Sequence, residues 1–390
     1  NTALGRNAGD GITTGSQNIA IGRHALSSNS AANDNIAIGY YALKVNTTGA
    51  NNVGVGVSAL GANTTASYNS AFGSAALAAN TTGAENTAVG YQALNDNTTA
   101  SYGTAVGYNA LEANTTGANN TAIGNDALLA NTTGASNTAV GYQSLGANTT
   151  ADENTSMGFQ SLLLNTTGTK NVAVGAYALD ANTTTGTHTA IGYQALSANT
   201  TGAQQTAVGA YALAANTTGT QNIAIGWGAI NANTTGDYNV ALGFAAMYNG
   251  SGGGGSNMAI GRYSLYENTT GNCNAAVGGN TLQNNTTGSY NIAVGHNALN
   301  DNTTGSNNLA IGRNALAVST TANDNTAVGY RALDANTTGH SNVGIGASAL
   351  NSLTTGDSHV AVGFKALEEA TTNENCVAIG KDALRETTTG

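Results

Sequence analysis

The chain has 390 residues, of which 53 are Gly and none is Pro, and only 8% of its residues are charged and 5% aromatic. Its net charge of -10 comes from 20 acidic and 10 basic residues with no basic patch, which argues against nucleic-acid binding. No apolar stretch is long enough to cross a bilayer, so we expect no membrane insertion in this segment.

A phrase of 17 residues, NxAxGxxALxxNTTGxx, is repeated 23 times, and the last copy is unfinished at Gly390. One Gly per copy keeps the 17-residue spacing from Gly5 to Gly380, apart from an 18-residue step between Gly243 and Gly261. A composition this poor in large side chains could belong to a disordered chain, but disorder does not require apolar residues to stay in phase. The constant phase predicts a solenoid in which each copy is one coil.

We number each repeat from its first Asn. Positions 2 to 5 alternate between β-branched and small residues, as in Ile19 to Gly22, which predicts a short strand. A second short strand is predicted around positions 7 to 11. Helix is the competing assignment for that Ala-Leu segment, but the repeat leaves room for little more than one helical turn. We therefore predict an all-β fold, a parallel β-solenoid (β-roll) of 23 coils.

The large apolar residues occupy two columns of the repeat. Position 4 is apolar in all 23 copies and position 9 is Leu in 20, so we predict that these two columns form the core. Positions 3, 5 and 8 hold small residues, which are needed where two backbones come close. We expect these small residues to form a face through which several chains associate, most simply as a homotrimer.

The triplet AsnThrThr recurs 16 times from position 12 and predicts a turn, with Gly at position 15 free to take a positive φ. Stacked coils would align the Asn and Thr side chains in hydrogen-bonded ladders. In a eukaryotic secretory pathway each triplet would instead be a glycosylation acceptor.

The whole chain, residues 1–390, is predicted to be a single continuous array and an uncapped section of a longer protein, because no polar cap is visible at either end. The one 18-residue repeat contains a Gly-rich insertion at residues 250–256 (GSGGGGS). No Lys or helix pattern follows this insertion, so we interpret it as a tolerated loop and not as a phosphate-binding site.

No residue constellation predicts an enzyme, because no paired carboxylates and no Ser or Cys with a base occur at one unique place. Cys273 and Cys376 are about six coils apart, too far for a disulfide, and are expected to be free thiols. No metal site and no cofactor are predicted, since the histidines lie in different repeats without further ligands at metal-binding spacing. These histidines are His24, His188, His296, His340 and His359.

Aromatic residues gather at position 6, where they occur in 10 of 23 copies. They follow the Gly at the strand end, so we expect an exposed, broken stripe able to contact sugars or apolar partners. Two alternatives stay open: the rings stack on their neighbours and shield the thin core, or they fill a groove between chains. The predicted stripe consists of Tyr40, Tyr91, Tyr108, Tyr142, Phe159, Tyr193, Trp227, Phe244, Tyr330 and Phe364.

Several segments resemble the head repeats of trimeric autotransporter adhesins: NIAIG at Asn18 to Gly22, Asn35 to Gly39 and Asn222 to Gly226, and NVAVG at Asn171 to Gly175. The longer phrase NTAVGYQAL at Asn86 to Leu94, followed by NTTG and copied closely from Asn137, is similar to repeats of bacterial and phage tail-fibre-like proteins. The resemblance covers the entire chain. It implies a left-handed parallel β-roll with three chains around one axis, displayed outside a cell or on a virion.

These observations predict a non-enzymatic extracellular rod, a fibre or adhesin repeat region that acts as a spacer and a multivalent attachment surface. The expected partners are further copies of the chain and, through the stripe, surface glycans or host-cell receptors. The alternative is an ice-binding β-solenoid. Against it, the Thr residues of positions 13 and 14 either point to different sides of a strand or sit in a turn, and position 2 is Thr in only nine copies.

Overall fold

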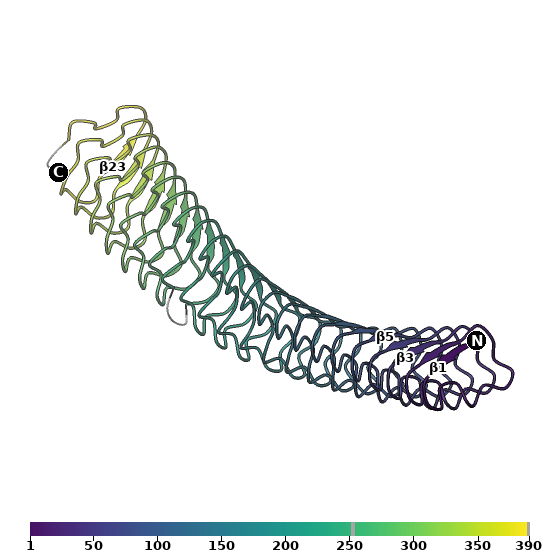
Figure 1. The fold of residues 1–390 in the computed structure, drawn as a ribbon. Coiled ribbons are helices and arrows are strands. Elements are labelled where there is room, and N and C mark those ends of the chain that lie inside the picture. Colours follow the sequence, from purple (N-terminus) through teal and green to yellow (C-terminus); the bar gives the residue numbers. More distant parts are fainter. Residues whose placement is uncertain (251–253, 388–390) are drawn as a thin grey trace. The chain divides into compact units, whose positions relative to one another are not determined.

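The computed structural model describes residues 1–250 and 254–387. The chain divides into two compact units, Asn1–Tyr193 and Gln194–Gly390, and each unit is a stack of coils (Figure 1). Each coil has one three-residue strand at positions 2 to 4, and neighbouring strands within a unit are parallel. The prediction of an all-β parallel solenoid with a 17-residue repeat is therefore confirmed.

The strands of the first unit are β1 Thr2–Leu4, β2 Ile19–Ile21, β3 Ile36–Ile38, β4 Val53–Val55, β5 Ser70–Phe72, β6 Thr87–Val89, β7 Thr104–Val106, β8 Thr121–Ile123, β9 Thr138–Val140, β10 Thr155–Met157, β11 Val172–Val174 and β12 Thr189–Ile191. Those of the second unit are β13 Thr206–Val208, β14 Ile223–Ile225, β15 Val240–Leu242, β16 Met258–Ile260, β17 Ala275–Val277, β18 Ile292–Val294, β19 Leu309–Ile311, β20 Thr326–Val328, β21 Val343–Ile345, β22 Val360–Val362 and β23 Val377–Ile379.

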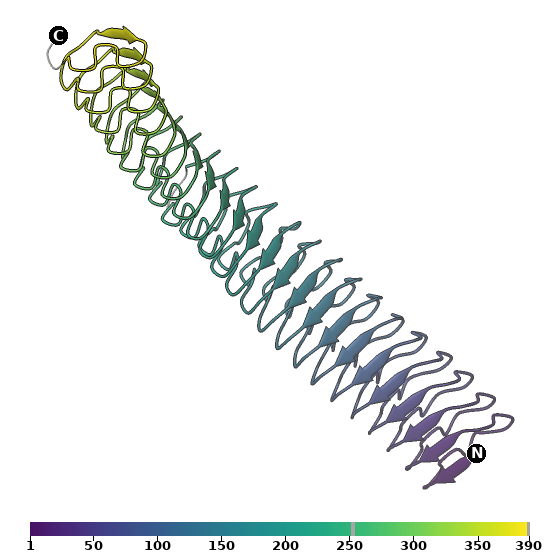
Figure 2. The same ribbon diagram turned by 90° about the horizontal axis from the view of Figure 1, so that it is seen from above.

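Adjacent strands pair in register, so equivalent positions of successive coils lie side by side (Figure 2). In the first unit Ala88 pairs with Ala105, 17 residues later. Between β15 and β16 the offset is 18, and Val240 pairs with Met258. The extra residue of the 250–256 insertion therefore leaves the register of the next strand unchanged. Residues 251–253 of that predicted loop lie outside the described residues.

Each strand ends at the Gly of position 5, which has a φ of +122° to +144° along its column. A Cβ on Gly90 would overlap the carbonyl oxygen of Gly107 in the next coil, so both the backbone angle and the close approach require Gly. Three further positions, 7, 9 and 17, adopt the left-handed region with non-Gly residues, at φ values of 48° to 64°. These conformations, uncommon for residues other than Gly, turn the chain through the corners of the coil.

The second predicted strand, at positions 7 to 11, is wrong. This segment forms turns, because left-handed residues at positions 7 and 9 prevent an extended backbone. Its amide groups still bond between coils: the N–H of Leu94 donates to the carbonyl of Ala110 at 3.0 Å, and that of Gln92 donates to Ser74, also at 3.0 Å. Turn corners are thus stacked by hydrogen bonds in the same way as the strands.

The interior of each coil is built from Ala at positions 3 and 8 and Leu at position 9. In the coil of β6, Ala88, Ala93 and Leu94 are all fully buried, which confirms the prediction for position 9. The prediction that position 4 is core is wrong: Val89 is 38% exposed. Successive strand residues point to opposite faces, so the inward Ala of position 3 directs positions 2 and 4 outward.

The expected small-residue face for association is also wrong. Positions 3 and 8, as in Ala88 and Ala93, are inside the coil and cannot meet another chain. Position 5 is small because it contacts the Gly of the next coil of the same chain. The narrow interior takes small residues opposite Leu, whereas the larger β-branched residues remain outside.

Two columns of buried Asn, at positions 1 and 12, close most of the coils. In the β6 coil, Nδ2 of Asn86 and Nδ2 of Asn97 both donate to the carbonyl of Ala100 at position 15, at 2.9 and 3.0 Å. Asn97 Nδ2 also donates to Oδ1 of Asn80 in the preceding coil at 2.8 Å. Thr98 Oγ1 donates to the carbonyl of Thr115 at 3.0 Å. The predicted Asn and Thr ladders are therefore confirmed.

The predicted positive φ for Gly at position 15 is wrong. Gly49 and Gly83 are not among the described residues with positive φ, and a Cβ on Gly83 would overlap the carbonyl oxygen of Ala100. Position 15 is small because it is buried against the next coil, while its own carbonyl receives the two Asn amides.

The division between the two faces of a strand can be tested with neighbouring residues of β7. Ala105→Val adds two methyl groups to a filled interior, and we expect it to lower the free energy of unfolding by about 1–3 kcal/mol. Val106→Ala removes the same groups from the outer face. It should cost less when both variants are made in a chain that carries added outer-face charges (Ile123→Asp, Val140→Asp) to prevent association through this face. Chemical unfolding followed by circular dichroism compares the variants, and a larger loss for Val106→Ala would contradict the assigned faces.

Candidate binding surfaces

All ten aromatic residues of the predicted stripe at position 6 are exposed, at 39% to 50% of their surface. Backbone hydrogen bonds keep the column in register: the N–H of Asp126 donates to Tyr108 and that of Gln143 donates to Asn125, both at 3.0 Å. The side chains of successive coils therefore stand next to one another on one surface of each unit. We call this surface the position-6 column.

Rings in adjacent coils of the column stack on each other. The ring centroids of Tyr91 and Tyr108 are 5.3 Å apart at an interplanar angle of 14°, and those of Trp227 and Phe244 are 4.9 Å apart at 14°. Stacking between neighbouring coils is thus confirmed for these pairs. The rings nevertheless keep large exposed areas, so stacking does not remove the column from contact with solvent.

The sequence pattern missed aromatic residues at positions 7 and 10 that join the column. Trp227 stacks on Tyr248 at 5.8 Å and 10°, and Gly228 makes room for this ring, since a Cβ there would lie 2.8 Å from it. A search for aromatic residues near position 6, and not only at it, would have found this cluster. Its members in the second unit are Tyr211, Trp227, Phe244, Tyr248, Tyr263 and Tyr266.

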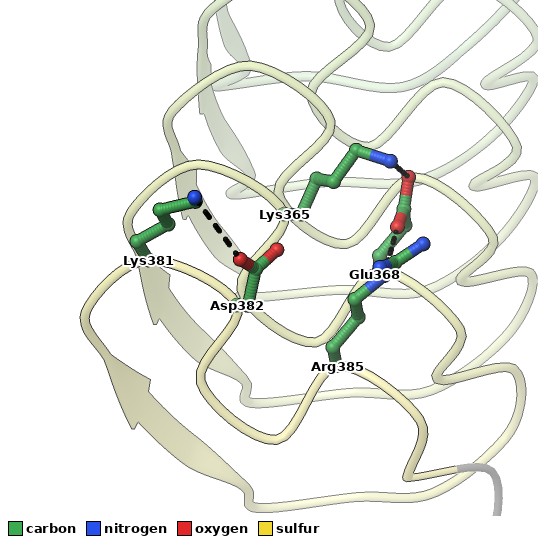
Figure 3. Close-up of polar contacts among 5 residues, drawn as sticks. All are labelled: Lys365, Glu368, Lys381, Asp382 and Arg385. Atoms are coloured by element: carbon green, nitrogen blue, oxygen red, sulfur yellow. Dashed lines mark hydrogen bonds and ion pairs between the residues drawn. The ribbon is translucent and has the colours of Figure 1, made fainter.

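Positions 7 and 10 of one coil are neighbours across a turn, and elsewhere they hold ion pairs. Glu368 receives Lys365 of its own coil at 3.1 Å and Arg385 of the next coil at 2.8 Å (Figure 3). Burial raises the pKa of Glu368, but the hydrogen bonds from Lys365 and Arg385 outweigh it, and the net pKa lies below its usual value. The side chains of Lys365 and Glu368 are half-buried, but ion pairs at the protein surface contribute only about 0–1 kcal/mol each. The ion pairs show that positions 7 and 10 lie at the solvent-facing surface of the coil.

A second surface is the outward side of the strands, whose position-4 residues were predicted to be core. We call the side chains at positions 2 and 4 the strand outer face. No residue at either position is charged in any of the repeats, and Phe72, Leu242 and Ile292 are 44%, 44% and 47% exposed. In-register pairing aligns these side chains in two columns within each unit.

Two histidines replace Asn in the position-1 ladder. Nε2 of His359 bonds to the carbonyl of Asn373 at 2.6 Å, and Nδ1 accepts from the backbone N–H of Cys376 at 3.3 Å. These are the two roles that Asn plays at position 1. His188 is also buried. Its backbone N–H donates to Oδ1 of Asn171 at 3.1 Å, and its ring Nε2 lies 3.0 Å from Thr185 Oγ1. Both histidines thus belong to the structural ladder.

Burial of the His188 ring lowers its pKa from 6.5 to about 4. The unfolded chain therefore takes up a proton near pH 6.5, whereas the folded chain does so only near pH 4. We expect the free energy of unfolding to fall by up to about 3 kcal/mol as the pH drops through this interval, and His188 to add no pH dependence above it. Chemical unfolding of wild type and His188→Asn at several pH values measures the difference.

The variant His188→Asn restores the residue of most other coils and should be less sensitive to acid than wild type. His24→Asn, which removes a half-buried histidine at position 7, controls for the loss of one imidazole. Identical pH profiles for wild type and His188→Asn would contradict the assignment.

The AsnThrThr triplets are closed to modification in the folded chain. The Asn of position 12 is fully buried in the coils of Asn63, Asn97 and Asn131. The Nδ2 of Asn97 uses both of its protons, one for Ala100 and one for Asn80, so a linked sugar would break two hydrogen bonds and the packing. The fold therefore supports the interpretation of the triplet as a turn.

In the described part of the chain, no group of three or more His, Cys, Asp or Glu is placed to hold a metal ion. Cys273 and Cys376 are both free, as expected. Among residues 1–250 and 254–387 there is no helix long and apolar enough to span a membrane. No known protein family matches the sequence, and no curated protein is significantly similar to it.

Proposed function

We propose that this chain is a non-enzymatic structural and adhesive repeat region, an extracellular fibre or adhesin segment made of several parallel copies of the chain. The strand outer face is the observation that carries the proposal. Its two columns hold no charged residue in a chain with a net charge of -10, and position 4 is apolar in every repeat. Exposed apolar columns of this length are typical of surfaces that bind a partner.

A second copy of the same chain is the occupant that fits this face best. Equal coil spacing in two parallel copies would let each column meet its equivalent over many coils, and each coil would add a similar increment of buried area. Three copies around one axis would bring the outer faces together in a closed arrangement without leaving one exposed. Three is also the number that the resemblance to trimeric adhesin heads implies.

Multi-angle light scattering of the full chain in solution tests association. We expect a mass of about three times 38.5 kDa. The double variant Ile123→Asp, Val140→Asp places charges on the outer face and should give a folded chain of lower mass, since buried unpaired carboxylates are costly. Thr133→Asp, Thr150→Asp adds the same charge at exposed position 14 of the same coils and should keep the wild-type mass. A folded wild-type monomer would contradict the proposal.

An ice-binding solenoid is the second candidate, and one observation favours it. Five consecutive strands carry an outward Thr at position 2, in register at sheet spacing, beside an apolar residue at position 4. These residues are Thr87, Thr104, Thr121, Thr138 and Thr155. Thermal hysteresis measured on the full chain discriminates the two candidates: we expect none, and clear hysteresis that is lost in Thr121→Leu, Thr138→Leu would favour ice binding instead.

A further inference from the structure

The position-6 column of the first unit has a gap of one coil. The five residues involved occupy successive coils, with Asn in the middle and two aromatic pairs outside it. They are Tyr91, Tyr108, Asn125, Tyr142 and Phe159. Because the backbone hydrogen bonds at positions 6 and 7 keep these coils in register, the rings on both sides of Asn125 stand two coils apart.

The rings bordering the gap are held by their outer neighbours. Tyr108 stacks on Tyr91 at 5.3 Å and 14°, and Tyr142 stacks on Phe159 at 5.3 Å and 16°. The opposite faces of Tyr108 and Tyr142 look toward Asn125, and within the described residues no third ring contacts them. Both side chains are well exposed, at 50% and 43%. The gap is therefore a slot with an aromatic face on each side.

A second one-coil gap in the same unit shows that a ring fits into such a slot. At position 6 the chain has Ala176 between Phe159 and Tyr193, and Tyr177 fills the space. Its ring is edge-on to Phe159, at 5.3 Å and 69°, and to Tyr193, at 6.2 Å and 83°. The corresponding position-7 residue of the Asn125 coil is Asp126, which has no ring. The chain thus closes one gap with its own side chain and leaves the other open.

We propose that the slot between Tyr108 and Tyr142 binds one pyranose ring of a neutral oligosaccharide. Two coil spacings place the ring centres about 10 Å apart. A sugar ring midway would lie about 5 Å from each, within the range at which rings make stacked contacts. A flat aromatic ligand in close contact with one of the two tyrosine rings would lie too far from the other ring to contact it. The slot favours a pyranose with C–H groups on both faces, such as a β-glucoside.

The floor of the slot carries hydrogen-bonding groups that suit hydroxyls. Asn125 is exposed and offers both a donor and an acceptor. Beside it, Asn109 Nδ2 donates to Oδ1 of Asp126 at 3.3 Å. Burial, with Asp96 and Asp126 nearby, raises the pKa of Glu112. This acidic surrounding disfavours anionic sugars, which is why the ligand is assigned as neutral.

This inference deepens the proposed attachment function and rests on it, because it names the ligand class and one place where it binds. Each chain contributes the slot at Asn125, and a further one-coil gap lies at Ala347 between Tyr330 and Phe364. An assembly of several chains would therefore present several such sites. Weak single sites joined in this way give useful avidity.

The test is binding of cellotetraose to the full chain by saturation-transfer NMR and calorimetry, with methyl β-galactopyranoside as the comparison ligand. Galactose has an axial hydroxyl that interrupts one C–H face, so it should bind more weakly. Asn125→Tyr continues the aromatic column and fills the slot, and we expect affinity to fall about tenfold or more because both ring contacts are lost. Ser74→Tyr adds a ring at position 6 beside Tyr91 without closing the slot, and should bind as wild type.

Loss of binding in Asn125→Tyr with retention in Ser74→Tyr supports the slot. Absence of cellotetraose binding to the wild type, or equal binding to Asn125→Tyr, overturns it. A change in the light-scattering mass of Asn125→Tyr would mean that the gap belongs to a contact between chains, and would also overturn it. These results are independent of the association test. If the chain is a trimer but binds no sugar, only the proposed sugar slot is rejected. If it is a monomer but binds cellotetraose, only the proposed trimer is rejected.

Discussion

In-register stacking of nearly identical coils is the constraint on which the rest of this structure depends. Each coil has only three residues of strand, so the strands alone would hold it weakly. The turn corners contribute further inter-coil hydrogen bonds, and in most coils two Asn side chains bind the position-15 carbonyl from inside. A buried Asn column is stable only when each amide meets an equivalent amide or carbonyl one coil away. The regular repeat supplies that partner.

The same constraint explains the unusual backbone. Left-handed residues at positions 7, 9 and 17 are costly for Leu or Gln, yet they recur in coil after coil. They close a 17-residue coil around a very narrow interior in which Ala faces Leu. An interior of this size excludes the β-branched residues of the strand, and these become an outer face. The apolar surface available for association is thus a direct consequence of a small core.

Surface positions of the coil accept a wider range of residue types than interior positions. Positions 6, 7 and 10 tolerate aromatic, charged and amide residues because their side chains contact only one another, within a coil and between neighbouring coils, outside the interior. The chain uses this freedom to build local features on a uniform scaffold, such as the ring cluster around Trp227, the ion pairs at Glu368 and the open slot at Asn125. Any single-site recognition must come from such departures from the repeat, because the repeat itself is the same everywhere.

The sequence by itself determined the all-β solenoid, the Leu column at position 9, the exposed aromatic column and the Asn and Thr ladders, because a constant 17-residue phase allows only like-on-like stacking. Only the tertiary structure decided which residues face inward. The pattern of Ile, Ala and Val in a strand predicts alternation but not its direction, and ranking residues by hydrophobicity selected position 4. The interior volume reversed that choice, since a coil closed by three left-handed corners has room for Ala at position 3 and none for Ile or Val.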